Sequence, residues 1–318
     1  MSRVLGIIAE YNPFHNGHLY HIAKSKEETG AQYVVAVISG NFVQRGNTSI
    51  VNKWVKTRMA LSNGVDLVIE LPTIYSTSSA ENFAEGAIKI LNSLGIVDTI
   101  SFGMEAKDIS TLNNIANVLY TEPKEYVTML THELKKGNSF PKARENALMM
   151  YLNDIKRYAN VMAGSNNILG IEYLKALKKT KSTITPVGIK REKVLYNDKY
   201  IVDEFASATA IRKMLMTKEL NDIRKVMPRS SYLLLGEELK DGHYVIDISR
   251  FEREILYTLR KMTVQEIANL PDVSEGLENS IKNAADSCNT LDELINIVKT
   301  KRFTQTRIQR ILIYSLLG

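Results

Sequence analysis

The chain has 318 residues, which is enough to bury a large core and to form more than one folding unit. Hydrophobic residues make up 44% and charged residues 24%, as in soluble globular proteins, and no long uncharged apolar stretch predicts a membrane span. The single cysteine, Cys288, excludes an internal disulfide and indicates a reducing cytoplasm, while a net charge of +6 favours polyanionic partners only weakly.

The first part of the chain alternates predicted strands and helices. The apolar, branched run at 3–11 predicts a buried strand, and it is too short for a signal peptide. Residues 16–30 then predict a helix that ends at Gly30. The next predicted elements are a strand at 32–40, a helix at 51–64, a strand at 65–72, a helix at 79–95 and a strand at 97–103. Repeated units of this kind predict an α/β fold, a doubly wound, Rossmann-like parallel sheet whose ligands bind beyond the carboxyl ends of the strands.

The second part of the chain is mostly helical. Residues 108–160 are polar and show no strand pattern, so we predict a helical insertion there, followed by a fifth strand at 183–191. Beyond residue 207 only helices are predicted, and TVQE (263–266) and TLDE (290–293) are capping-box patterns that open two of them. We expect two domains: residues 1–225, with the sheet and the insertion, and residues 226–318, a helical C-terminal region.

A histidine-rich segment follows the first predicted strand. The sequence EYNPFHNGHLYHI (10–22) holds three of the five histidines in the chain. Gly17 has no Cβ, so the backbone can approach a ligand closely, and the helix that begins here points unpaired N–H groups at that ligand. Imidazoles can donate hydrogen bonds to phosphate oxygens, so we predict that His15 and His18 are catalytic and brace a triphosphate. The predicted chemistry is nucleotidyl transfer, in which a nucleophile displaces pyrophosphate from ATP.

A metal site is less favoured for these histidines. The i, i+3 spacing lacks the i, i+4 pair with a carboxylate that helical zinc sites use, so we predict no metal ligand. His21 is expected to be an ordinary packing or exposed histidine. A His-x-x-His pattern is weak evidence by itself, and it gains weight here because it directly follows the first strand of an α/β pattern.

A second motif, SATAIR, lies far downstream at 207–212. Ser207, Thr209 and Arg212 place two hydroxyls and a guanidinium at the start of a predicted helix, which suits a second phosphate-binding helix N-terminus. The alternative is a simple N-cap with an exposed arginine.

The two motifs together resemble those of the HIGH-type nucleotidyltransferase superfamily. Further segments resemble, in order, those of the bacterial tRNA(Met) cytidine acetate ligase family: AEYNPFHNGHLYH, SGNFVQRG, KWVKTRMAL, GVDLVIELP, SNNILGIEYLKAL and KRFTQTRIQRIL. The resemblance implies a two-step reaction in which ATP and acetate form acetyl-adenylate and pyrophosphate. The acetyl group then passes to N4 of the wobble cytidine of elongator tRNA(Met). The resemblance implies that ATP is a substrate and that it binds with Mg²⁺, whose protein ligands the sequence does not identify. It also implies a cytoplasmic location.

The resemblance also implies an ATP site. Its positions fall on Gly103, Asn166 and Arg191 and on the loop Ile7, Ile8, Ala9, Glu10, Tyr11, Asn12, Pro13, Phe14, His15, Asn16, Gly17, His18, Leu19 and Tyr20. To these we add Ser207, Thr209 and Arg212, which we predict as ATP-binding residues from their own chemistry. Gly103 has no Cβ, so the end of its strand can pass close to a nucleotide. The Asn166 amide can donate to or accept from polar groups of a base. The planar guanidinium of Arg191 can bind phosphate through two N–H groups.

Two basic segments are candidates for contacts with substrate. In the loop GNFVQRG (40–46), Gln44 and Arg45 face the substrate or belong to a flexible surface loop. In KWVKTRMAL (53–61), Lys53 or Arg58 approaches phosphate or tRNA, or the helix is simply a solvated basic one.

The C-terminal tail is the predicted tRNA-binding surface. Arg302, Arg307 and Arg310 lie close together with Phe303 between them, a composition that suits a phosphate backbone with occasional stacking. A solvated basic helix is the alternative. Relatives usually continue beyond TRIQRIL, whereas this sequence stops at Gly318, so we expect a shortened or naturally short member.

Two other functions fit the histidine motif. One is an adenylyltransferase that joins AMP to a small phosphorylated metabolite. The other is a catalytically inactive nucleotide- or RNA-binding regulator, against which the intact His15 and His18 argue.

Overall fold

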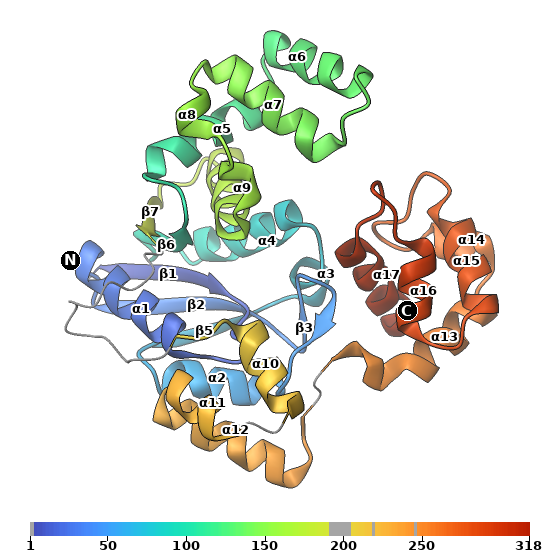
Figure 1. Ribbon diagram of the computed structural model, residues 1–318. Coiled ribbons are helices and arrows are strands. Elements are labelled where there is room, and N and C mark those ends of the chain that lie inside the picture. The colour runs from blue at the N-terminus through green and yellow to red at the C-terminus, as the bar shows by residue number, and fades with distance from the viewer. Residues whose placement is uncertain (1–2, 191–204, 218–219, 245–246) are drawn as a thin grey trace.

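The computed structural model describes residues 3–190, 205–217, 220–244 and 247–318. Its centre is a five-stranded sheet in the order β5-β2-β1-β6-β7, in which every neighbouring pair is parallel (Figure 1). The strands are β1 (Val4–Ala9), β2 (Tyr33–Ser39), β5 (Leu67–Leu71), β6 (Thr99–Met104) and β7 (Thr185–Lys190). The predicted α/β parallel sheet is therefore confirmed. The strand order reverses at β1, and ligands of such sheets bind at this switch point.

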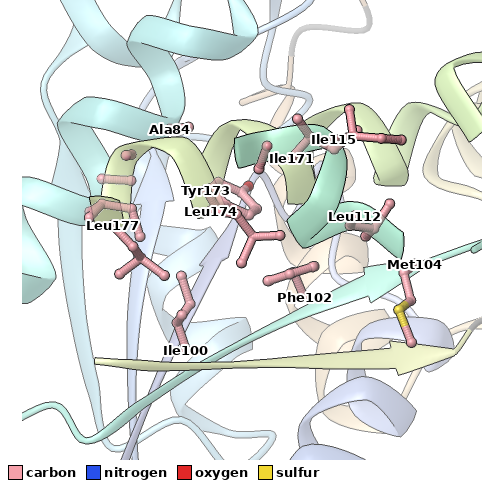
Figure 2. Close-up of a cluster of buried hydrophobic side chains, with 14 of the residues drawn as sticks. Ala84, Ile100, Phe102, Met104, Leu112, Ile115, Ile171, Tyr173, Leu174 and Leu177 are labelled. Carbon is pink, nitrogen blue, oxygen red and sulfur yellow. The ribbon is translucent and has the colours of Figure 1, made fainter. Parts of the chain in front are cut away.

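Helices cover both faces of the sheet. Figure 1 shows α4 (Ala80–Ser93) and α9 (Ser165–Lys179) on one side, and α2 (Lys53–Leu61), α11 (Leu220–Val226) and α12 (Arg229–Asp241) on the other. On the first side, Phe102 of β6 packs among Leu112, Ile171 and Leu174 (Figure 2). Gly170 lets α9 approach this strand, because a Cβ there would lie 2.7 Å from the Phe102 ring. Apolar burial on both faces explains why the strands read as continuous apolar runs.

The predicted helical insertion is helical in the structure. It consists of α5 (Ile109–Thr121), α6 (Lys124–Lys135), α7 (Phe140–Leu152), α8 (Ile155–Tyr158) and the 3₁₀ turn η1 (Val161–Ala163). The other elements near the sheet are α1 (Asn16–Thr29), α3 (Thr73–Ser76) and α10 (Ala208–Thr217). Gly30 ends α1 in the left-handed region, at a φ of 65°, as the sequence predicts.

A short hairpin follows β2, at a position where the sequence pattern also allows a flexible loop. Strands β3 (Phe42–Val43) and β4 (Asn47–Thr48) pair antiparallel within GNFVQRG and its flank. Strands of two residues give no periodic pattern, so the sequence could not predict them. The hairpin contacts the C-terminal region, because the Ile248 N–H donates to the Asn47 side-chain oxygen at 2.9 Å.

The C-terminal region has its own core. Its elements are η2 (Ile248–Phe251), α13 (Glu252–Lys261), α14 (Val264–Ala268), α15 (Leu277–Ser287), α16 (Leu291–Val298) and α17 (Gln305–Leu317). TVQE forms a complete capping box at the start of α14. TLDE forms only half of one at α16, because the Glu293 carboxylate accepts from the Asn289 N–H instead of from that of Thr290.

The packing suggests a different domain boundary from the expected one at residue 225. Leu234 and Leu235 of α12 belong to the same buried cluster as Val55 and Met59 of α2. The separate C-terminal cluster begins at Ile248. We therefore propose that the sheet domain includes α12 and that the C-terminal region begins near residue 247. Among the described residues, no helix combines the length and the apolarity needed to cross a membrane.

Candidate active site at the carboxyl end of the central strand

The predicted histidine loop leaves the carboxyl end of β1 and is held firmly in place. The Asn12 side chain is buried, donates to the Thr48 carbonyl at 3.1 Å and accepts from the Ile50 N–H at 2.8 Å. These bonds fix the loop against the strand that ends the hairpin and the residues that follow it. Ile7 and Phe14 point into the core, so their main chain, and not their side chains, is available to a ligand.

His15 and His18 form the capping box that opens α1. Nδ1 of His15, whose side chain is 5% exposed, accepts from the Gly17 N–H at 3.0 Å. Nδ1 of His18 accepts from the His15 N–H at 3.2 Å. Because Nδ1 is the acceptor in both rings, each neutral imidazole carries its proton on Nε2, which becomes a donor. The arrangement can therefore present two N–H donors from one helix start.

Neighbouring rings lock this pair in position. The His15 and His18 rings stack with centroids 3.7 Å apart, and Tyr11 lies edge-on to His18 at 4.8 Å. Burial raises the pKa of the Tyr11 hydroxyl, so it stays neutral. Gly17 is required here for packing as well as for access, because a Cβ would lie 2.9 Å from the His15 ring.

His21 has a packing role, as expected. Its Nε2 lies 2.9 Å from the Ser101 hydroxyl, which in turn contacts the Ser25 hydroxyl at 2.5 Å. These contacts join α1 to β6.

The fold brings SATAIR against the histidine loop. Arg212 donates to the Asn12 carbonyl at 2.6 Å and to the Thr209 hydroxyl at 3.1 Å. Ser207 caps α10 by accepting from the Ala210 N–H at 3.2 Å. Burial lowers the pKa of Arg212, and its guanidinium is turned onto the loop. The expected N-cap is therefore present, but Arg212 is not the exposed arginine that a simple N-cap would leave.

The other predicted ATP-site residues are spread over two further elements. Gly103 is the next-to-last residue of β6 and pairs with Ile189 of β7, so it does not itself end the strand. Asn166 lies in the first turn of α9, where its amide donates to the Glu105 carboxylate at 2.5 Å. Arg191 lies outside the described residues.

Sequence reasoning missed Lys56 on α2. This lysine is 0% exposed, and its ammonium donates to the Ser39 carbonyl at 2.6 Å and to the Glu10 carbonyl at 3.1 Å. Burial lowers its pKa to about 8. It ties the end of β2 to the start of the histidine loop. The signal was available, since Lys56 shares a helix face with the apolar Met59 and Ala60, three and four residues on.

The predicted substrate residues after β2 divide into two kinds. Gln44 is used structurally, because its N–H donates to the Glu10 carboxylate at 2.9 Å and its amide donates to the Ser78 carbonyl at 3.0 Å. Arg45 is exposed and lies close enough to Arg212 to lower the pKa of that guanidinium.

Comparisons with known proteins identify the family. A family model described as HIGH Nucleotidyl Transferase matches residues 2–318. Two proteins named tRNA(Met) cytidine acetate ligase, from Acetivibrio thermocellus and Caldanaerobacter subterraneus subsp. tengcongensis, are each 49% identical to this chain. The matches cover 99% and 98% of the chain and 77% of each relative.

The chain belongs to the tRNA(Met) cytidine acetate ligase family. A solved structure agrees: Thermotoga maritima TmcAL bound with alpha-thio ATP has a TM-score of 0.90 and 37% sequence identity. That match covers 99% of this chain and 74% of the other. The ligase family and its fold are thus those that the sequence motifs predict.

The arginines predicted to bind tRNA differ in their surroundings. Arg310 is 8% exposed and donates to the Asp272 carboxylate at 2.6 Å. Arg307 donates to the Asp272 carbonyl at 2.7 Å and to the Ser274 hydroxyl at 2.8 Å. Arg302 is exposed and pairs with Glu275. Arg310 therefore serves the fold in this structure, whereas Arg302 and Arg307 lie at the surface beside Phe303.

A dedicated metal cage is not evident in the part of the chain that the structure describes. There, no three His, Cys, Asp or Glu side chains gather into a metal-binding group. Magnesium bound with ATP is held largely by phosphate oxygens and water. No residue is assigned as a magnesium ligand.

Proposed function

We propose that this protein is an ATP-dependent ligase that activates acetate as acetyl-adenylate. It then transfers the acetyl group to N4 of the wobble cytidine of elongator tRNA(Met) and forms N4-acetylcytidine. The observation that carries the proposal is the His15–His18 pair, which presents two Nε2 donors at the switch point of the sheet. The names of the close relatives support the substrate assignment.

In the first step, the triphosphate of ATP lies at the start of α1. An acetate oxygen attacks the α-phosphorus, the bond to the β-phosphate oxygen breaks, and pyrophosphate leaves. Nε2–H of His15 and of His18 donate to phosphate oxygens whose charge grows in the transition state. Arg212 holds the loop through the Asn12 carbonyl, so the donors are already in place before the reaction. Magnesium would add positive charge on the phosphates when bound.

In the second step, the cytidine N4 amine attacks the acetyl carbonyl carbon. AMP leaves, N4 loses a proton, and an amide bond forms. We propose that Gly103 and Asn166 contact the nucleoside of ATP and that Arg302 and Arg307 contact tRNA phosphates. Because the substrate is a tRNA, we also infer a cytoplasmic location.

The proposal is tested by incubating the protein with ATP, labelled acetate and elongator tRNA(Met), and by digesting the RNA to nucleosides. We expect labelled N4-acetylcytidine that depends on both ATP and acetate. An adenylyltransferase would instead join AMP to an added phosphorylated metabolite and leave the tRNA unlabelled. An inactive regulator would bind ligand without consuming ATP.

A further inference from the structure

Trp54, the single tryptophan of the chain, is exposed although the helix that carries it is well packed. It is the second residue of α2, and its side chain is 71% exposed. Val55 and Met59 on the same helix are buried against the sheet. The ring has no role in the core and is accessible to a partner. A single exposed ring is ordinary on a protein surface, so the case for a binding site rests on the groups around it.

Cationic side chains lie next to this ring. The Lys53 ammonium is 5.5 Å from the indole centroid, although it also pairs with Glu70 at 2.6 Å. Arg58, one helical turn further on, has a side chain that is 60% exposed, and its guanidinium lies 3.9 Å from the Glu237 carboxylate. Exposed aromatic rings with nearby cations suit single-stranded nucleic acid, in which bases stack on the rings and phosphates meet the cations.

A cavity of about 220 Å³ lies beside the start of α2. Asn41, Phe42, Ser49 and Asn52 line it from the hairpin and the residues before α2, whereas His243, just after α12, and Phe251 of η2 complete the lining. Ser49 is 5% exposed, and its hydroxyl has no hydrogen-bond partner among the described residues. The lining therefore combines aromatic rings with amide and hydroxyl groups, as sites for unstacked bases do.

The same cavity is poorly suited to a phosphate. The first backbone N–H groups of α2 already have acceptors, because Asn52 Oδ1 accepts from Trp54 and Val55 at 3.0 and 3.1 Å. Asn41 Oδ1 accepts from the Lys53 N–H at 2.9 Å. Because these N–H groups are already bonded, the start of α2 is a poor site for an anion. A flat base with polar edges suits the cavity better.

Two residues that line this cavity also contact the histidine loop. Thr48 and Ile50, which also line the cavity, are the residues that hold the Asn12 side chain. We propose that Trp54 and the adjoining cavity form a binding site for unpaired nucleotides of the tRNA anticodon loop. The site would hold bases next to the wobble cytidine while that cytidine reaches the acetyl-adenylate. This inference rests on the proposed function, since it takes tRNA as the substrate.

The single tryptophan makes a direct test available. An anticodon stem-loop RNA of elongator tRNA(Met) is added to the protein, and Trp54 fluorescence and RNA binding by filter retention are followed together. We expect the indole emission to be quenched in parallel with binding. Binding with unchanged emission would overturn the stacking role of Trp54, because no other tryptophan contributes to the signal.

Variants test the energetic contribution. We expect Trp54→Ala to weaken RNA binding about tenfold, Trp54→Phe to restore most of the affinity, and Phe251→Ala to weaken it by a smaller factor. Tyr33→Ala is the matched control. Tyr33 is 51% exposed, but it lies at the amino end of β2, whereas the cavity lies beyond the carboxyl end of that strand. Unchanged affinity in Trp54→Ala would overturn the inference.

Acetyl-adenylate formation without RNA separates this inference from the proposed function. We expect Trp54→Ala to make acetyl-adenylate at the wild-type rate. If wild-type protein binds and acetylates tRNA while Trp54→Ala is unimpaired in both, only the nucleotide-binding site is wrong. If wild-type protein binds no tRNA at all, both the inference and the acceptor assignment fail.

Discussion

His15 and His18 each perform two tasks with one ring. Nδ1 holds the backbone at the start of α1, and the ring proton is on Nε2, the atom that we propose donates to a phosphate oxygen. The two tasks can be separated, because an asparagine side chain can replace the capping acceptor but cannot place a donor where Nε2 lies.

We therefore predict that His15→Asn leaves the free energy of unfolding within about 1 kcal/mol of wild type, because asparagine is a good N-cap. Acetyl-adenylate formation should fall about 10²- to 10³-fold, as expected when one preorganised donor is lost. Urea denaturation and single-turnover assays measure the two effects. His21→Ala is the control and should retain most activity, since His21 bonds to Ser101. Wild-type rates in His15→Asn would contradict the assignment.

Lys56 gives a prediction about pH. Its pKa is lowered by burial from 10.5 to about 8. Between these pH values the unfolded chain holds a proton that the folded protein has released, so unfolding takes up a proton and stability rises with pH. A shift of this size corresponds to about 3 kcal/mol.

We predict that the stability of wild type relative to Lys56→Met increases by up to about 3 kcal/mol between pH 7 and pH 10. Urea denaturation at several pH values measures the difference, and Lys53→Met on the same helix is the control. A difference that does not change with pH would show that the ammonium of Lys56 is not buried as described.

At the residue level, the sequence could predict side chains that act through a local motif, and it could not predict those defined by distant partners. His15, His18 and Gly17 are neighbours in the chain, so their joint role was visible. The carbonyl partners of Lys56 and the Asp272 partner of Arg310 are brought close only by tertiary packing. A buried arginine and an exposed one look the same in a basic segment.

The β3–β4 hairpin is the element that joins the active-site loop to the C-terminal region. Gly46, at its turn, has a φ of +74°, and a Cβ there would lie 2.5 Å from the Arg310 backbone nitrogen. Tyr314 of the same helix, α17, donates to the Thr77 carbonyl beyond β5. Helix α17 therefore packs directly against the turn.

We predict that Gly46→Ala destabilises the protein by about 3 kcal/mol, through left-handed backbone strain of about 1–2 kcal/mol and the clash with α17. Gly95→Ala is the matched control: its φ is +66°, but nothing lies within 4 Å of the added Cβ, so only the backbone strain applies. Thermal or urea denaturation compares the two. Equal losses would show that α17 does not approach Gly46.

At the element level, long apolar or amphipathic segments were predictable because their patterns match one regular structure over many residues. All five strands of the sheet and the helices α1, α2 and α4 lie where the patterns placed them. The hairpin is too short to carry such a pattern. The affiliation of α12 with the sheet domain depends on contacts with α2, which sequence spacing does not reveal.

At the scale of the whole molecule, we propose that the sheet domain binds ATP and that the C-terminal region contributes contacts with tRNA. Among the three arginines of the basic tail, Arg302 is exposed and Arg307 is partly buried, whereas Arg310 is buried and supports α17. A test of tRNA contacts should therefore leave Arg310 in place.

We predict that the double variant Arg302→Gln/Arg307→Gln binds tRNA more weakly and has a log–log salt slope that is shallower by about one unit per lost phosphate contact. Acetyl-adenylate formation should be unchanged. Lys142→Gln, on the helical insertion, is the control with one exposed cation removed. An unchanged affinity and slope would show that tRNA docks elsewhere.

The most direct test of the central claim is exchange of labelled pyrophosphate into ATP in the absence of tRNA. Reversible formation of acetyl-adenylate at the His15–His18 site predicts exchange that requires acetate, needs no tRNA and is nearly lost in His15→Asn. Exchange that does not depend on acetate, or that persists at the wild-type rate in His15→Asn, would contradict the account.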